Sequence, residues 1–174
     1  LAYAQVKKAS ALANKDLGKL QSSHANLIAT ACDEIIEGKH HGQFPLVVWQ
    51  TGSGTQTNMN LNEVIANRAN ELDGKARGSM SPIHPNDHVN LSQSSNDSFP
   101  TAMHVTTAQA VSYSLLPIIN KLIEELHKKQ IDFEDIIKTA RTHMMDATPI
   151  TFGQEFSGYV AQLDFAKKQI EHNL

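Results

Sequence analysis

A run of hydroxyl and amide side chains over residues 51–60 is the first part of the sequence that can do chemistry. The run contains Gly52 and Gly54, has no charged residue, and leads directly into an apolar periodicity typical of a helix. A helix N-terminus offers free N–H groups and a favourable dipole to an anion, and glycine lets the backbone approach a ligand closely. The run therefore indicates anion binding, with a loop and an N-cap as the alternative that Ser and Thr also favour.

A second neutral cluster occupies residues 92–98 and again combines hydroxyl and amide side chains. It stands directly before the helix that we expect from Pro100, because the first turn of a helix accepts proline. Capping of that helix by Asp97 or Ser98 is the structural alternative. Two neutral, donor-rich helix N-termini in one short chain favour a binding function.

Histidines supply two further candidates. His84 and His88 are four residues apart beside Asp87, a spacing at which metal ligands share a helical face, but Asn and Asp next to Pro more often build turns. We therefore expect no metal site. His143 lies in an irregular segment between two predicted helices, and imidazole exchanges protons near neutral pH. Of the nine histidines it is the best candidate for general acid–base catalysis.

Helices must position these clusters, because apolar residues recur mainly at steps of three and four. The helices predicted on this basis cover about residues 24–37, 58–72, 100–130 and 152–170. Gly38 and Gly74 are the expected stop signals of the first two. Pro117 lies inside the third without interrupting its apolar seam, so we expect a kink rather than an end.

The remaining segments are polar or isolated. Residues 75–96 predict an ordered loop with a short helical turn, and the apolar run at 45–49 is a lone candidate strand. The fold class is therefore mainly α: an N-terminal helical and irregular region followed by long helices. Their apolar seams need partners, which favours a helical bundle assembled from several chains. We expect a piece of a longer protein, since both ends stop inside a pattern.

Composition excludes several other classes of function. The 174 residues include 15 basic and 18 acidic ones without any basic block, so nucleic-acid binding is not expected. No stretch approaches 18 consecutive apolar residues, so we expect no membrane span. Cys32 is the single cysteine, which excludes an intramolecular disulfide and suits a reducing compartment.

Taken together, the clusters resemble class II fumarase, within the fumarase/aspartase superfamily, from about residue 20 to the end. The stretches that carry the resemblance are WQTGSGTQTNMN at 49–60, HPND at 84–87, QSSND at 93–97, FPTAM at 99–103, RTH at 141–143, DATP at 146–149 and GQE at 153–155. Such a series of ordered motifs in one short chain is very improbable by chance.

The resemblance implies the reversible hydration of fumarate to L-malate in the citric acid cycle, through a carbanion stabilised as an aci-carboxylate. It implies His143 as the catalytic residue that positions the water and handles its proton. The implied substrate-binding residues are Ser53, Gly54, Thr55, Ser94, Ser95, Asn96 and Thr142. The implied second dicarboxylate site consists of His84, Pro85, Asn86 and Asp87.

The resemblance also implies how the protein is built. Residues 1–93 would be part of the N-terminal domain and residues 94–174 the start of a central helical bundle. Members of the family are homotetramers whose active sites are shared between subunits, and they need no metal or organic cofactor. A cytoplasmic location is expected, with the mitochondrial matrix as the alternative for a eukaryotic source.

One catalytic part of the family pattern does not occur in these residues. The base that removes the carbon-bound proton is a serine on a glycine- and serine-rich loop, so we expect the chain alone to be inactive. Two alternatives stay open: an aspartate ammonia-lyase, or a non-catalytic helical assembly module. Ammonia-lyases usually carry other residues at the positions of Ser53, His84, Ser95 and His143, and all four differences favour fumarase.

Overall fold

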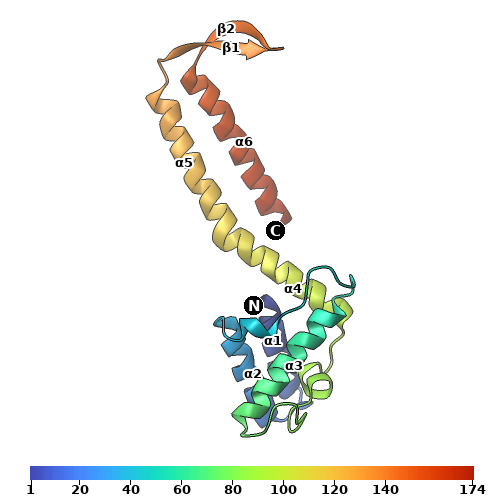
Figure 1. The fold of residues 1–174 in the computed structure, drawn as a ribbon. Helices are drawn as coiled ribbons and strands as arrows, with labels where there is room; N and C mark the ends of the chain where they lie inside the picture. Colours follow the sequence, from blue (N-terminus) through green and yellow to red (C-terminus); the bar gives the residue numbers. More distant parts are fainter. The chain divides into compact units, whose positions relative to one another are not determined.

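The computed structural model describes residues 1–174, which form six α-helices, three short 3-10 or π-helical turns and one two-stranded sheet (Figure 1). The mainly α fold class is thereby confirmed. The chain divides into two compact units, Leu1–Thr106 and Thr107–Leu174. None of the helices is both long enough and apolar enough to span a membrane.

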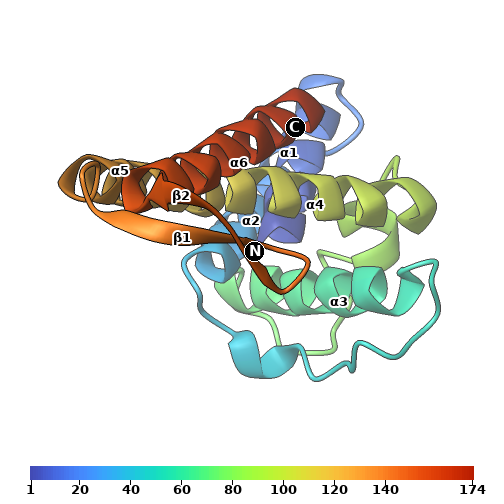
Figure 2. The ribbon, with the colours of Figure 1, turned by 90° about the horizontal axis from the view of Figure 1, so that it is seen from above.

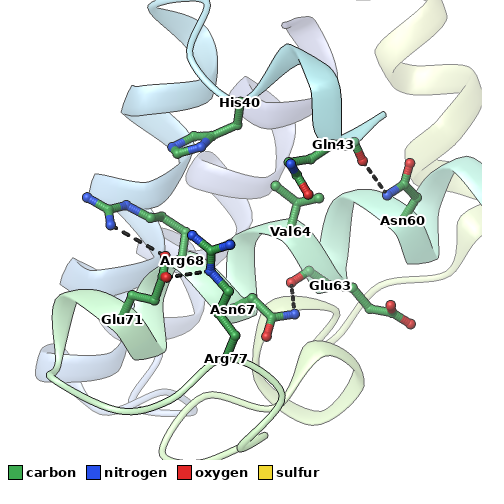
Figure 3. Close-up of a pocket in the computed structure, with 9 residues that line it drawn as sticks. All are labelled: His40, Gln43, Asn60, Glu63, Val64, Asn67, Arg68, Glu71 and Arg77. Atoms are coloured by element: carbon green, nitrogen blue, oxygen red, sulfur yellow. Dashed lines mark hydrogen bonds and ion pairs between the residues drawn. The ribbon is translucent and has the colours of Figure 1, made fainter. Parts of the chain in front are cut away.

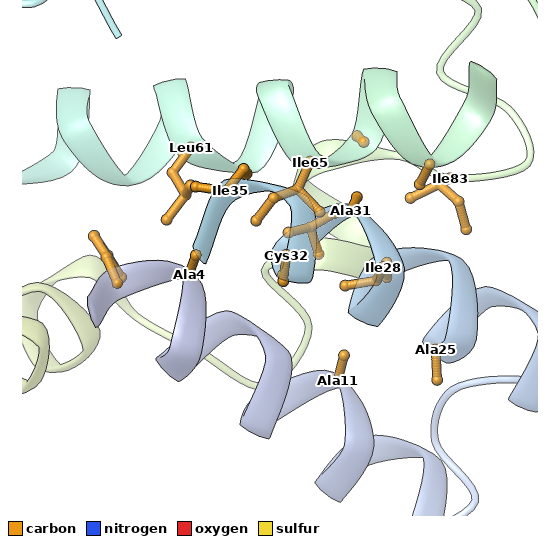
Figure 4. Close-up of a cluster of buried hydrophobic side chains, with 14 of the residues drawn as sticks. Ala4, Ala11, Ala25, Ile28, Ala31, Cys32, Ile35, Leu61, Ile65 and Ile83 are labelled. Atoms are coloured by element: carbon orange, nitrogen blue, oxygen red, sulfur yellow. The ribbon is translucent and has the colours of Figure 1, made fainter. Parts of the chain in front are cut away.

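Three helices form the core of the first unit: α1 (Ala2–Asp16), α2 (Ser22–Ile36) and α3 (Thr55–Leu72). On each of them the buried side chains recur at steps of three and four, so one face points inward (Figure 4). Alanines at many of these positions let the helix backbones approach closely. The core residues of the three helices include Ala4, Ala11, Ala25, Ile28, Ala31, Cys32, Ile35, Leu61, Ile65 and Ala69.

Helices α2 and α3 end where the sequence predicts. Gly38 and Gly74 follow their last residues with φ of 87° and 75°, a region that glycine enters without steric cost. Their N–H groups donate to carbonyl oxygens of the last turn, that of Ile35 at 3.0 Å and that of Glu71 at 2.9 Å. Both predicted stops are confirmed.

The strand predicted at residues 45–49 is wrong. This segment follows the turn η1 (His41–Gln43) without pairing to any strand, and Val48 and Trp49 are 96% and 95% exposed. Apolar content alone therefore misled the prediction, because a strand needs a hydrogen-bonded neighbour. The helical turn predicted within residues 75–96 is confirmed as the π-helical turn η2 (Pro85–Val89).

Helix α4 (Ser95–Ala110) begins five residues before the predicted start at Pro100, which lies inside it. The polar residues before Pro100 have low helix propensity, so the sequence pattern placed them in a loop. Helical structure continues through the π-helical turn η3 (Val111–Leu115) into α5 (Leu116–Asp132). The chain thus stays helical past Pro117, as predicted, with the irregularity just before that proline.

The second unit contains a feature that the sequence analysis missed. Strands β1 (Ile137–Thr142) and β2 (Met145–Thr151) form an antiparallel hairpin between α5 and α6 (Phe152–Asn173). Helices α5 and α6 run side by side in opposite directions (Figures 1 and 2). An ideal Cβ on Gly153 would lie 2.7 Å from the carbonyl oxygen of Gln130, so glycine permits this close contact near the base of the hairpin.

Candidate active site

The first predicted cluster lies at the N-terminus of α3. Gly54 is the N-cap residue with φ of 70°, and no side chain caps the helix, so the N–H groups of its first turn remain available to a ligand. An ideal Cβ on Gly54 would lie 2.2 Å from Cγ of Phe99, which belongs to α4. Glycine is therefore required here both by the backbone conformation and by the close approach of an aromatic ring.

A chain of hydroxyl groups joins the first cluster, at residues 51–60, to the second neutral cluster, at residues 92–98. The Ser53 hydroxyl lies 3.1 Å from those of Thr51 and Thr55, and the Thr55 hydroxyl lies 3.1 Å from that of Ser95. Thr55 and Ser95 are the first residues of α3 and α4. The structure therefore brings together two helix N-termini that are 40 residues apart in sequence.

Ser94 and Asn96 complete the N-terminus of α4. The Ser94 carbonyl oxygen accepts from the N–H of Ser98 at 2.9 Å, and its hydroxyl accepts from the N–H of Asn96 at 3.4 Å. Ser94 itself, rather than Asp97 or Ser98, stands at the capping position. The combined cluster from α3 and α4 exposes hydroxyl and amide groups, and Asp97 is the one charged residue in these two first turns.

Buried polar side chains that the sequence analysis did not single out support this cluster. The Tyr3 hydroxyl donates to Oδ1 of Asn58 at 2.6 Å and lies 2.8 Å from the hydroxyl of Ser98. Burial raises the pKa of Tyr3. Because Asn58 belongs to the first turns of α3 and Ser98 to those of α4, Tyr3 ties the two helix N-termini together. No sequence signal marks such a residue, since its partners are 55 and 95 positions away.

Thr142 and His143 belong to the second unit. Thr142 ends β1, and His143 and Met144 form the turn of the hairpin with φ of 49° and 58°. Consecutive residues with positive φ define the tight turn that matches the twist of paired strands. The irregular segment predicted around His143 is therefore wrong: the residue stands at the exposed tip of an ordered hairpin. Turns of this kind favour Asn and Gly, and neither stands at these two positions, so no local signal marks the hairpin.

The residues of the predicted second dicarboxylate site, His84 to Asp87, form one compact turn in the first unit. Nδ1 of His84 accepts from the N–H of Asp87 at 3.2 Å, and Nδ2 of Asn86 donates to Oδ1 of Asp87 at 3.3 Å. Pro85 begins this turn and is buried. Nδ1 of His88 accepts from the N–H of His84 at 2.8 Å, and burial lowers the pKa of His88, with a smaller contribution from nearby histidines. The histidines here hold the turn.

A separate groove of about 330 Å³ lies beside α3 (Figure 3). Both arginines of the groove form ion pairs: Arg68 donates to both oxygens of Glu34, at 2.6 and 2.8 Å, and Arg77 pairs with Glu71. The Arg68 guanidinium lowers the pKa of Glu34 to about 2. None of the predicted site residues lines the groove. Its lining residues are His40, Gln43, Asn60, Glu63, Val64, Asn67, Arg68, Glu71 and Arg77.

The fold and the cluster define a mainly helical protein in which hydroxyl, amide and N–H donors gather at two joined helix N-termini. A family model described as lyase matches residues 2–174. The chain belongs to this lyase family.

The individual relatives agree with that assignment. "Fumarate hydratase class II" of Pseudomonas syringae pv. tomato is 63% identical over 165 residues, which is 95% of this chain and 36% of the relative. The crystal structure of class II fumarase from Schistosoma mansoni superposes with a TM-score of 0.94 and 50% identity, covering 98% of this chain and 36% of that one.

A fumarate lyase:delta crystallin structure from Brucella melitensis gives a TM-score of 0.93 with 44% identity, covering 98% of this chain and 40% of that one. The predicted resemblance to class II fumarase is confirmed. The chain spans somewhat more than a third of the length of these relatives.

Proposed function

We propose that the chain supplies the dicarboxylate-binding part of a class II fumarate hydratase, which interconverts fumarate and L-malate. The observation that carries this proposal is the contact between Thr55 and Ser95, which merges two helix N-termini into one cluster of hydroxyl, amide and N–H donors. Fumarate and malate are dianions, and preorganised neutral donors stabilise the additional charge that develops when the carbanion forms. Ser53, Gly54, Thr55, Ser94, Ser95, Asn96 and Thr142 are the proposed carboxylate-binding residues.

His143 is the proposed catalytic residue on the oxygen side of the reaction. In hydration, it orients the water and accepts the proton that the water loses as its oxygen bonds to carbon. In the reverse direction the protonated imidazole returns that proton to the leaving hydroxyl group. The exposed tip of the hairpin suits this role, because the ring is not enclosed by its own unit.

The rest of the proposed assembly follows from the same family. Residues 1–93 belong to its N-terminal domain and residues 94–174 begin a central bundle of a cytoplasmic homotetramer. Exposed apolar side chains of the second unit support such self-association, among them Tyr113, Ile118 and Phe165, which are 82%, 61% and 66% exposed. His84, Pro85, Asn86 and Asp87 are proposed as a second dicarboxylate site.

The test follows fumarate absorbance after the complete enzyme is mixed with malate and, in parallel, with aspartate. Fumarate formed from malate alone supports the proposal. Fumarate formed from aspartate would make the protein an ammonia-lyase, and no reaction with either would favour a helical assembly module. The 174-residue chain alone is the negative control, for which we expect no turnover.

A further inference from the structure

Lys7 on α1 is the only charged residue among the buried residues of the chain, and it has no exposed surface. Its Nζ donates to Oδ1 of Asn90 at 3.0 Å and to Oε1 of Gln93 at 2.9 Å. Both partners are neutral amides, and no carboxylate pairs with Lys7. A buried ammonium group without a counter-charge is strongly unfavourable, so such an arrangement calls for a functional explanation.

The two amide partners lead directly to the candidate active site. Gln93 immediately precedes Ser94, the residue that caps α4. Asn90 Oδ1 also accepts from Nδ2 of Asn58 at 3.1 Å, and Asn58 is the fourth residue of α3. Lys7 is therefore connected to each of the two helix N-termini through a single amide side chain.

The other ionisable groups around Lys7 do not offset its charge at neutral pH. The Tyr3 ring lies 5.3 Å from its Nζ, and burial raises the pKa of Tyr3. Burial raises the pKa of Cys32 on α2 to about 12, so this thiol stays neutral. Asp33 on α2 is engaged with Lys8 at 2.6 Å. Burial lowers the pKa of Lys7 itself to about 8, with a smaller opposing effect of Cys32.

We infer that Lys7 is a counter-charge of the dicarboxylate site, a positioning residue that attracts the dianion through the Asn90–Gln93 network without touching it. The inference rests on the proposed function. The donor cluster at the surface carries no cation of its own, whereas a charge buried in a medium of low dielectric acts over several ångströms. The same ammonium group fixes the amides that hold the two helix N-termini in place.

This arrangement couples dianion binding to the protonation of Lys7. A bound dianion stabilises the ammonium form, so protonation of Lys7 and binding favour each other. Affinity is then full below about pH 8 and is lost as the pH rises through that value. A monoanion gains less from the same charge and therefore shows a smaller dependence on pH.

The experiment measures binding of succinate, an unreactive dianion, and propionate, a monoanion, to the complete enzyme by titration calorimetry. For the wild type we expect succinate affinity to fall roughly tenfold between about pH 7 and about pH 9.5, and propionate affinity to fall much less. In Lys7→Met we expect succinate affinity to be roughly tenfold weaker at about pH 7 and nearly constant with pH. Lys8→Met removes the neighbouring surface charge and should behave as the wild type.

Two results would overturn the inference: a Lys7→Met enzyme that keeps the wild-type pH dependence, or a wild-type affinity for succinate that is flat over this range. The second result needs no variant, so the inference remains testable if Lys7→Met does not fold. A wild type that binds no succinate at about pH 7 would overturn the proposed function, and this inference with it.

Discussion

Replacing Gly54, the N-cap residue of α3, with alanine should lower the stability of the fold for two separate reasons. The residue has φ of 70°, where a side chain costs about 1 kcal/mol. The new Cβ would also lie 2.2–2.6 Å from three ring atoms of Phe99, and such overpacking costs about 1–3 kcal/mol. We therefore expect Gly54→Ala to lower the free energy of unfolding by about 3 kcal/mol.

Two other glycines of the same unit separate these penalties. Gly74 has φ of 75° with no atom near an added Cβ, so Gly74→Ala should lose only about 1 kcal/mol. Gly52 has neither feature, so Gly52→Ala should stay within about 0.5 kcal/mol of the wild type. Adding Phe99→Ala to Gly54→Ala should remove the steric part, so the two changes together should cost less than their sum.

The assay is urea unfolding of the 174-residue chain followed by circular dichroism. The wild type, the three single glycine variants, Phe99→Ala and the double variant with Gly54→Ala and Phe99→Ala are measured side by side. The reasoning is refuted if Gly54→Ala is no less stable than Gly74→Ala. It is also refuted if the losses caused by Gly54→Ala and Phe99→Ala are simply additive, because the ring would then not limit the space at Gly54.

Three further predictions concern other parts of the chain. Gly153→Ala should lower the free energy of unfolding in urea by about 2 kcal/mol, because the new Cβ would clash with backbone atoms of α5 and of the residues that follow it. Gly158→Ala on the same helix meets open space and should be neutral or stabilising. Equal effects of the two substitutions would contradict this prediction. Thr55→Val should raise the KM of the complete enzyme for malate about tenfold with little change in the midpoint of thermal unfolding, because it removes only the hydroxyl that contacts Ser53 and Ser95. An unchanged KM would contradict this prediction. Arg68 lowers the pKa of Glu34 to about 2, so the stability that this carboxylate contributes is present above about pH 4.5 and is lost as the pH falls through 2. The free energy of unfolding of Glu34→Gln should therefore depend less on pH in this range than that of the wild type. The same pH dependence in both proteins would contradict this prediction.

The features that could be predicted from the sequence are those that depend only on residues close together in the chain. The apolar spacing of α2 and α3 and the glycines after them predicted both helices, because one face is buried and a left-handed residue follows the last turn whatever the rest of the fold does. The clusters at residues 51–60 and 92–98 could be recognised because each is a continuous run of mainly hydroxyl and amide residues directly before a predicted helix.

Features that depend on distant partners were not predicted. The hairpin of β1 and β2 turns at His143 and Met144, which carry none of the residues typical of such turns, so neither strand was recognised. Lys7 and Tyr3 stand in a polar helical segment and look like surface residues. They are buried because their partners, such as Gln93 and Ser98, come from segments more than 80 positions away.

The most direct test of the account compares the wild-type complete enzyme with its His143→Asn variant in malate dehydration, with succinate binding as the control for an intact site. We expect kcat to fall by about a hundredfold or more, as for loss of a general acid–base group, while succinate affinity stays within about twofold of the wild type. A variant that dehydrates malate at the wild-type rate would contradict the role of His143 and the proposed mechanism.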